Sequence, residues 1–297
     1  MKKLRTAYIA LGIVSFLWGT TYIASKIGAQ HMPGLFIAGL RQFTAGMIMV
    51  SFFLIRGYKL PDLQSLKSIS IQGILLLCLA NGGLTWSLEY ISGGLAAIIA
   101  ALVPLLITLF SIWLLKQAKF TKLMFAGMLV GLSGVIVIFY DYLHQLKNSS
   151  FAFGVGLAVL STISWAFGSV YSARKKLPVD IMFNVGLQML IAGVVTLVIC
   201  AFSGKFVNPV HAGWATWYAL LYLVVFGSLI AYSAYVFAIS KLPPTLVSIY
   251  AYINPIVAVL LGWVLLNEKM NSSIVLGTMI TLGGVFLVNR EFRKQRA

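Results

Sequence analysis

An arginine lies inside an apolar stretch that is long enough to cross a membrane. The stretch "GLFIAGLRQFTAGMIMVSFFL" covers residues 34–54 and contains Arg41. A charged side chain at the centre of a membrane helix costs about 2.5–3.5 kcal/mol on insertion scales, so it usually pairs with a carboxylate or with backbone carbonyls. Lys26 and Glu89 end the first and third apolar segments on the same predicted outer side. We therefore predict that Arg41 pairs with Glu89 and that Lys26 lies near them.

This predicted charge cluster has two interpretations. In the functional one, Lys26, Arg41 and Glu89 form an outer gate or an anchor for a substrate carboxylate. In the structural one, they form a static polar lock between helices, or the long side chains reach to the membrane interface. The sequence leaves both interpretations open.

Aromatic residues form the second candidate set. Trp18 and Trp165 lie about eleven and twelve residues into their segments, near the membrane midplane. Residues of the interfacial aromatic belt, such as Trp214 and Trp217, do not lie at that depth. The alternatives are helix packing and the lining of a cavity, where aromatic faces could also hold an ammonium group. The other members of this set are Trp86, Tyr232, Tyr235 and Tyr250.

Prolines and amides within apolar segments form the third candidate set. Pro104 and Pro255 are predicted to break their helices, and such paired interruptions point to a transporter's binding site. Asn254 precedes Pro255, and Asn81 lies beside two glycines in "LANGGLTW". Each amide could bind substrate or satisfy backbone groups that a kink has freed.

Signals for bond-making chemistry are missing from the sequence. The six Asp and Glu and the three His are scattered, the two Cys form no CxxC or metal-ligand spacing, and no GxxxxGK[ST] loop occurs. We therefore expect no metal and no cofactor, and we expect neither an ATP-driven pump nor an enzyme.

The composition indicates the elements that must position these residues. The chain is 60% hydrophobic and only 9% charged, whereas soluble domains average about 45–50% apolar and about 25% charged residues. We expect an integral membrane protein in contact with lipid. The net charge of +16 does not indicate nucleic-acid binding, because the basic residues fall between long apolar runs.

Ten segments meet the requirement of about 20 mostly apolar residues for a membrane span. They are 7–26, 35–55, 71–89, 94–115, 123–140, 153–172, 181–202, 215–238, 244–266 and 274–289. The alternating pattern of a β-barrel is absent, so we expect helices.

The basic residues predict the orientation of these spans. With the N-terminus in the cytoplasm, 17 of the 22 Lys and Arg fall in inside segments, four fall outside, and Arg41 lies within a span. Because Lys and Arg are enriched in cytoplasmic loops, we expect both termini to face the cytoplasm.

The two halves of the sequence resemble each other. "VPLLITLFSIWLLKQAKF" (103–120) aligns without gaps on "NPIVAVLLGWVLLNEKMN" (254–271), with Pro104 on Pro255. Each copy has five spans, so the second copy enters the membrane upside down, as is common in secondary transporters. We therefore divide the chain into 1–147 and 148–297. The fold class that we predict is an all-α integral membrane protein of ten transmembrane helices, arranged as two inverted five-helix repeats.

Several motifs carry a resemblance to a known family. They are "FLWGTTYIASK" (16–26), "FIAGLRQFTAG" (36–46), "ALVPLLITLFSIWLL" (101–115) and "YINPIVAVLLGWVLLNEKM" (252–270). With them the chain resembles the EamA family of ten-helix exporters in the drug/metabolite transporter superfamily. Members often carry a glutamate after both the fourth and ninth spans. Here Glu268 follows the ninth, but "KQAK" (116–119) follows the fourth.

The resemblance implies a fold and a function. It implies a central cavity surrounded by the first, third, fourth, sixth, eighth and ninth spans, and export of a small metabolite by alternating access. An amino acid or an amphipathic compound is the substrate class that we expect, and the bacterial inner (plasma) membrane is the expected location. A membrane-embedded enzyme acting on lipid and a facilitative channel are the alternatives.

Glycines at close-packing spacing mark the fifth and tenth spans. Gly127, Gly131 and Gly134 lie on the fifth, and Gly277, Gly283 and Gly284 lie on the tenth. Small residues let helices approach closely. We expect packing within the chain, with a homodimer face as the second option.

Overall fold

The computed structural model describes residues 2–115, 121–140, 145–175, 177–208, 213–248, 250–268 and 271–294. Across these ranges the chain forms helices and connecting segments and contains no strand. A helix satisfies its backbone hydrogen bonds within the segment, which a span in lipid requires. The prediction of an all-helical protein is therefore confirmed for the described residues.

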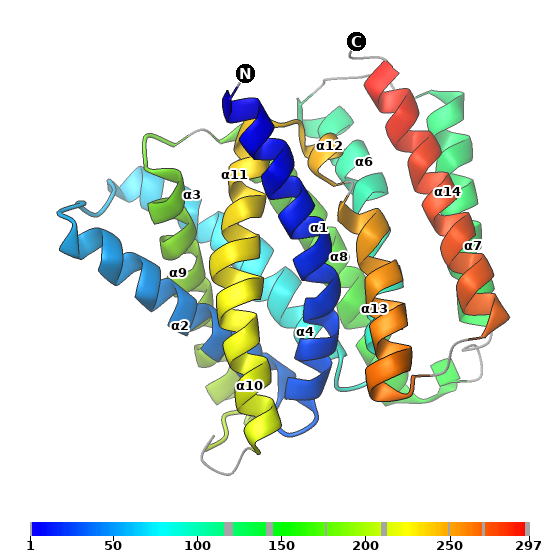
Figure 1. The fold of residues 1–297 in the computed structure, drawn as a ribbon, viewed down its shortest axis with the longest axis horizontal. Helices are drawn as coiled ribbons and strands as arrows, with labels where there is room; N and C mark the ends of the chain where they lie inside the picture. Colours follow the sequence, from blue (N-terminus) through cyan, green and yellow to red (C-terminus); the bar gives the residue numbers. More distant parts are fainter. Residues whose placement is uncertain are drawn as a thin grey trace.

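The helices follow one another through short connections (Figure 1). In chain order they are α1 (Lys2–Ala29), α2 (Gly34–Ile55), α3 (Leu63–Gly73), η1 (Ile74–Gly82), α4 (Gly83–Ser87), α5 (Gly93–Ala100), α6 (Val103–Leu115), α7 (Lys122–Tyr140), η2 (Gln145–Lys147), α8 (Ser149–Arg174), α9 (Ile181–Phe202), α10 (Trp214–Tyr222), η4 (Leu223–Tyr232), α11 (Ser233–Lys241), α12 (Pro244–Val247), α13 (Tyr250–Leu266) and α14 (Ser272–Lys294). In Figure 1 the first residues of α1 and the last residues of α14 lie at the same end of the bundle.

Seven helical stretches are long and apolar enough to cross a membrane. They are Leu4–Ala29, Gly34–Ile55, Leu63–Ser87, Gly93–Leu115, Ser149–Arg174, Ile181–Phe202 and Trp214–Lys241. Three shorter apolar helices cover Lys122–Gly134, Ile253–Leu266 and Ser272–Val288. Each of the ten predicted segments falls on one of these stretches, and the protein is a multi-pass helical membrane protein.

The helices of the two halves are interleaved. α2 packs along α9, and α7 packs along α14 at one edge of the bundle (Figure 1). α1 from the first half packs on α13 and on the helix α10–η4–α11, while α8 from the second half packs on α6 and on η1 and α4. The centre of the molecule is therefore built by helices from both ends of the sequence.

The predicted glycine seam lies between α7 and α14, except for Gly283, where an added Cβ would meet no atom within 4 Å. A Cβ on Gly284 would lie 2.5 Å from the Cα of Gly131, and one on Gly127 would lie 2.8 Å from Val288 Cγ2. Both contacts are too short for a side chain, so these glycines allow the two helices to touch through their backbones. The seam is used within the chain, in agreement with the packing interpretation.

The two predicted helix breaks have different outcomes. Pro104 is the second residue of α6, directly after the interruption at Ala101 and Leu102. α13 instead continues through Pro255, and the second half is interrupted earlier, after Val247. The predicted break at Pro255 is therefore wrong in position.

Packing explains why α13 continues through its proline. A proline removes one i→i−4 hydrogen bond, but α13 packs along α1 at this level. A Cβ on Gly19 of α1 would lie 2.6 Å from Val257 Cβ, so the two helices are in close contact directly after Pro255. Asn254 also supports this turn. With its amide oriented to donate, its nitrogen lies 3.2 Å from Tyr250 O and 3.1 Å from Ser15 O.

Candidate functional site

A cavity lies where the helices of the two halves meet. About 820 Å³ of space in and around it, including space that is open to solvent, is free of protein atoms. The lining residues come from α1, α2, η1, α4, α5, α6, α8, η4 and α13. The first, third, fourth, sixth, eighth and ninth predicted spans all contribute, and α2 from the second span does so as well.

Six of the eight predicted cavity residues lie in this lining. They are Trp18, Asn81, Trp165, Tyr232, Tyr250 and Asn254. Trp86 and Tyr235 lie elsewhere. The Trp86 ring packs against Phe153 at a centroid distance of 5.3 Å, and Tyr235 is fully buried behind the lining.

Four aromatic rings form one wall of the cavity and the layer behind it. The Trp18 ring lies 5.1 Å from that of Trp165 and 5.0 Å from those of Tyr235 and Tyr250. Trp18 and Trp165 meet edge to face, which is the arrangement that aromatic quadrupoles favour. The wall offers an apolar surface of ring faces and edges, and the sequence pointed to Trp18 and Trp165 because they lie too deep for the interfacial belt.

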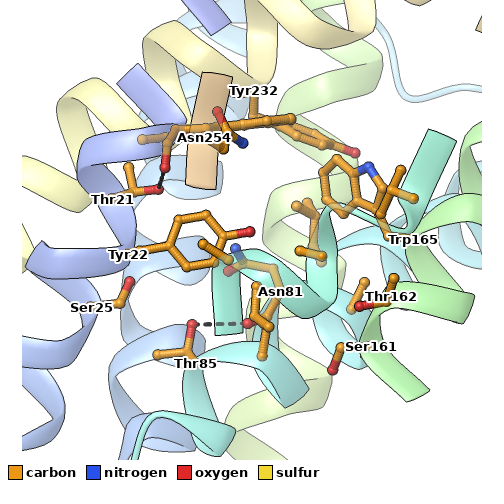
Figure 2. Close-up of a pocket in the computed structure, with 18 of the residues that line it drawn as sticks. Thr21, Tyr22, Ser25, Asn81, Thr85, Ser161, Thr162, Trp165, Tyr232 and Asn254 are labelled. Carbon is orange, nitrogen blue, oxygen red and sulfur yellow. Dashed lines mark hydrogen bonds between the residues drawn. The ribbon is translucent and has the colours of Figure 1, made fainter. Parts of the chain in front are cut away.

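One face of α1 contributes polar groups that the sequence analysis missed. Thr21, Tyr22 and Ser25 line the cavity, and Figure 2 shows their side chains along the same helix. They follow Trp18 by three, four and seven residues, which is the spacing of one helical face. That spacing was a readable signal. Thr85, Ser161 and Thr162 add hydroxyls from α4 and α8.

Arg41 enters the cavity from α2. It is 3% exposed, and its Nε donates to Ser228 Oγ on η4 at 2.7 Å. Ser228 Oγ in turn donates to Gln42 Oε1 at 3.4 Å, and Gln42 Nε2 donates to Asn81 Oδ1 at 3.2 Å. The guanidinium also rests on Gly227, where a Cβ would lie 2.7 Å from Nη2.

The predicted pairing of Arg41 with Glu89 is wrong. Glu89 accepts from the backbone N–H of Gly34 at 2.7 Å and forms an ion pair of 3.0 Å with Lys205, which follows α9. Gly34 begins α2, and Arg41 is seven residues further on, or about 10 Å along the axis. The carboxylate therefore caps the helix start, and the arginine lies two turns deeper.

Lys26 does not join Arg41 either. Its ammonium donates to the backbone oxygens of Leu88 and of Ile91, the latter at 3.0 Å. The two carbonyls belong to the connection between α4 and α5, so Lys26 stabilises that connection from the end of α1. The snorkelling interpretation also fails for Arg41, because its side chain is buried at the cavity.

Glu268, from the second half, binds to the first half beside the connection that Lys26 contacts. Its Oε1 accepts from Gly93 N–H at 2.8 Å and its Oε2 from Gly94 N–H at 3.2 Å, at the start of α5. A carboxylate at a helix N-terminus satisfies orphan donors and interacts favourably with the helix dipole. The first-half counterpart at 116–119 lies outside the described residues.

The lining is suited to binding. Among the described residues around the cavity, it combines aromatic rings, hydroxyls, amides and one guanidinium. Apolar walls with a few placed polar groups are typical of small-molecule sites.

Comparison with known proteins agrees with this architecture. The uncharacterized inner membrane transporter YedA of Escherichia coli (strain K12) is 38% identical to this chain over 274 residues, covering 91% of this chain and 86% of that protein. The uncharacterized transporter YoaV of Bacillus subtilis (strain 168) is 24% identical over 291 residues, covering 97% and 99%. One solved crystal structure matches 99% of both chains with a TM-score of 0.68 at 21% identity, which supports the fold alone.

The family match covers nearly the whole sequence. The model of the EamA-like transporter family matches residues 5–140 and, a second time, residues 152–290. The chain therefore belongs to the EamA-like transporter family of the drug/metabolite transporter superfamily.

Proposed function

We propose that the protein is a secondary transporter that exports a small metabolite, an amino acid or another amphipathic compound, from the cytoplasm. The observation that carries this proposal is a central cavity lined by helices of both halves. In an alternating-access carrier, the site lies between two repeats that rock against each other. Substrate bound there would be exposed first to one side of the membrane and then to the other.

The proposed architecture is ten spans in two inverted repeats, 1–147 and 148–297. Two matches of one family to successive parts of the chain support the repeat. The helix packing supports it too, because α1 contacts the eighth and ninth spans in the way that α8 contacts the third and fourth. The π-helical segments η1 and η4 also occupy the third span and the eighth, which correspond in the two copies.

The proposed location is a bacterial inner membrane with both termini in the cytoplasm. YedA is named as an inner membrane transporter. The start of α1 and the end of α14 lie at one end of the bundle (Figure 1). The distribution of Lys and Arg in the sequence favours the cytoplasm for that end. Export as the direction follows from the family resemblance.

Counterflow in proteoliposomes tests the proposal. Vesicles are loaded with one unlabelled compound at a time and offered a trace of the same labelled compound, over a panel of amino acids and amphipathic acids and amines. A carrier accumulates label transiently against its gradient. Trp165→Ala, in the cavity wall, should reduce this accumulation strongly.

The matched control is Trp113→Ala. Trp113 lies on α6 and is 68% exposed on the outside of the bundle, so this variant removes an indole that does not touch the cavity. Equal effects of the two substitutions would contradict the cavity as the transport site. A channel would equilibrate label without any transient accumulation.

A further inference from the structure

The charge of the cavity indicates which ligand it fits. Among the described lining residues, Arg41 is the only charged side chain. Glu89 and Glu268 accept hydrogen bonds at helix starts outside this lining. A buried charge without a counter-ion is strongly unfavourable, so the cavity is electrostatically incomplete without an anion.

The hydrogen bonds of Arg41 lead to the same conclusion. A guanidinium has five N–H donors in a planar fork. Nε uses its donor on Ser228 Oγ, and the described part of the chain supplies no acceptor for the four N–H groups of the two terminal nitrogens. These unused donors belong to a side chain that is 97% buried and lines the cavity.

The surroundings of Arg41 fix the guanidinium in place. Ser228 holds Nε, and the missing side chain of Gly227 leaves room for Nη2. Trp18 Nε1 donates to Gly227 O at 3.3 Å, which ties the aromatic wall to the same turn of η4. The terminal fork and the aromatic wall are therefore held next to each other.

We propose that the cavity binds an amphipathic organic anion. Its carboxylate accepts two hydrogen bonds from the terminal nitrogens of Arg41, the geometry in which arginine binds carboxylates best. Its apolar body lies against Trp18, Trp165 and Tyr250. This inference rests on the proposed function and narrows its substrate class.

The same features predict that the cavity binds zwitterions and cations more weakly than anions. A zwitterionic amino acid brings no net charge, so the cavity would keep the charge of Arg41. Its ammonium group would find amide and hydroxyl oxygens and aromatic faces, but no carboxylate among the described lining residues. A cation would face the guanidinium directly.

A matched charge series tests this order on the wild-type protein in lipid nanodiscs at neutral pH. The probes are 3-phenylpropanoate, phenylalanine and 2-phenylethylammonium, which share a phenyl ring on a two-carbon chain and differ in charged groups. Acetate supplies the carboxylate without the phenyl ring and its carbon chain.

Binding is read from the fluorescence of the cavity tryptophans and from the shift in unfolding temperature. We expect 3-phenylpropanoate to bind about tenfold or more tightly than phenylalanine, because both carboxylates can pair with Arg41 but the ammonium of phenylalanine must be buried without a carboxylate partner. The amine and acetate should show no saturable binding.

Two variants assign the effect to Arg41. Arg41→Gln should bring the affinity for 3-phenylpropanoate down to that for phenylalanine or below. Arg41→Lys keeps the charge without the fork and should bind the anion more weakly than wild type but still in preference to phenylalanine. Lys205→Gln removes a cation outside the lining and should keep the wild-type order.

The outcomes separate the two proposals. Tighter binding of phenylalanine or of the amine than of 3-phenylpropanoate overturns the anion site, as does binding of none of the four probes. If Arg41→Gln fails to fold, the wild-type charge series still decides. If the predicted order holds but counterflow fails, the anion site stands and the carrier function is wrong. If counterflow occurs with amines or amino acids in preference to acids, the carrier stands and the anion site is wrong.

Discussion

Arg41 and Glu268 both carry a charge within the helical bundle, but the protein surrounds them differently. Glu268 uses both carboxylate oxygens on the N–H groups of Gly93 and Gly94. Arg41 uses one of its five donors on Ser228 and lines the cavity, and no other hydrogen bond of its guanidinium occurs among the described residues. Charges that a fold uses for stability are usually paired and hydrogen-bonded. The contrast separates a structural charge from one that is available to a ligand.

The other charges near Glu268 follow the structural pattern. Glu89 is shared between Gly34 N–H and Lys205, and Lys26 is held by two backbone carbonyls. All of them join helix ends or connections. Substitutions in this group should change stability, and substitutions around Arg41 should change binding.

The largest effect is expected for Gly227→Ala. A Cβ at this position would lie 2.7 Å from Arg41 Nη2 and 3.0 Å from Thr21 Cγ2, so the guanidinium must move. Loss of one charge-assisted hydrogen bond, worth about 1.5–3 kcal/mol, should weaken 3-phenylpropanoate binding by about ten- to a hundredfold. Titration by tryptophan fluorescence measures the change.

Gly156→Ala on α8 is the control for that substitution. A Cβ on Gly156 meets no atom within 4 Å, so this variant changes the glycine content of a helix without touching the cavity. Wild-type affinity in Gly227→Ala would show that the position of the guanidinium does not determine binding.

A smaller effect, on stability alone, is expected for Glu268→Gln. The neutral amide has one acceptor oxygen in place of two, and it loses the favourable interaction of a carboxylate with the start of α5. We expect a loss of about 1–2 kcal/mol in the free energy of unfolding and unchanged ligand affinity. Thermal unfolding in nanodiscs measures the first, and the fluorescence titration measures the second. Glu291→Gln, near the end of α14, controls for the change from glutamate to glutamine. A reduced affinity for 3-phenylpropanoate in Glu268→Gln would contradict the purely structural role of Glu268.

The ion pair of Glu89 with Lys205 should contribute less. Both side chains are partly exposed, at 17% and 26%, and such pairs contribute up to about 1 kcal/mol. A double-mutant cycle with Glu89→Gln and Lys205→Met measures the coupling. A coupling free energy well above this range would mean that this ion pair holds its connection as firmly as the Glu268 cap holds the start of α5.

The pH dependence of this pair has a definite sign. Burial alone would lower the pKa of Lys205, but the hydrogen bond and the charge of Glu89 outweigh it, and the pKa is raised. A raised pKa means that the stabilisation is present below the unfolded value and is lost as pH rises through the folded value. The difference in unfolding temperature between wild type and Lys205→Met should therefore stay constant from neutral pH to about pH 9. A difference that disappears within this range would contradict the assignment.

The smallest effect is expected at Asp62, a solvent-exposed residue that caps the start of α3. Its carboxylate accepts from the N–H groups of Gln64 and Ser65, and hydrogen bonds from Ser65 lower its pKa. Asp62→Ala should lower the unfolding temperature slightly at neutral pH. That difference should shrink as pH falls through the lowered pKa. Asp62→Asn, which keeps a capping oxygen, should unfold like wild type.

The sequence predicted the helices well, because hydropathy and length determine which segments enter a membrane. Trp18 and Trp165 were also identified, since their depth excluded the interfacial belt. Thr21, Tyr22 and Ser25 could have been found from their spacing to Trp18. Each of these features follows from the sequence of a single helix and needs no knowledge of how the helices pack.

The partners of Arg41 could not be predicted in the same way. Depth along the chain suggested Glu89, but a contact also depends on the rotation of each helix about its axis. Ser228 and Gly227 lie 187 and 186 residues after Arg41 in the sequence, and they meet it only because α2 and η4 pack together. Pro255 shows the same limit, because contact with α1 overrides the local tendency of proline to break a helix.

The distance in sequence between Arg41 and Ser228 has a consequence for biosynthesis. At about 5–20 residues per second, the ribosome needs about 10–40 s to add the 187 residues between them. During that interval α2 carries its guanidinium without the serine that later holds it. Its insertion must then depend on its own apolar residues, whose mean hydropathy of 1.5 meets the level of a membrane span. In this order of synthesis Arg41 precedes η4, and its hydrogen bond to Ser228 can form only when η4 follows.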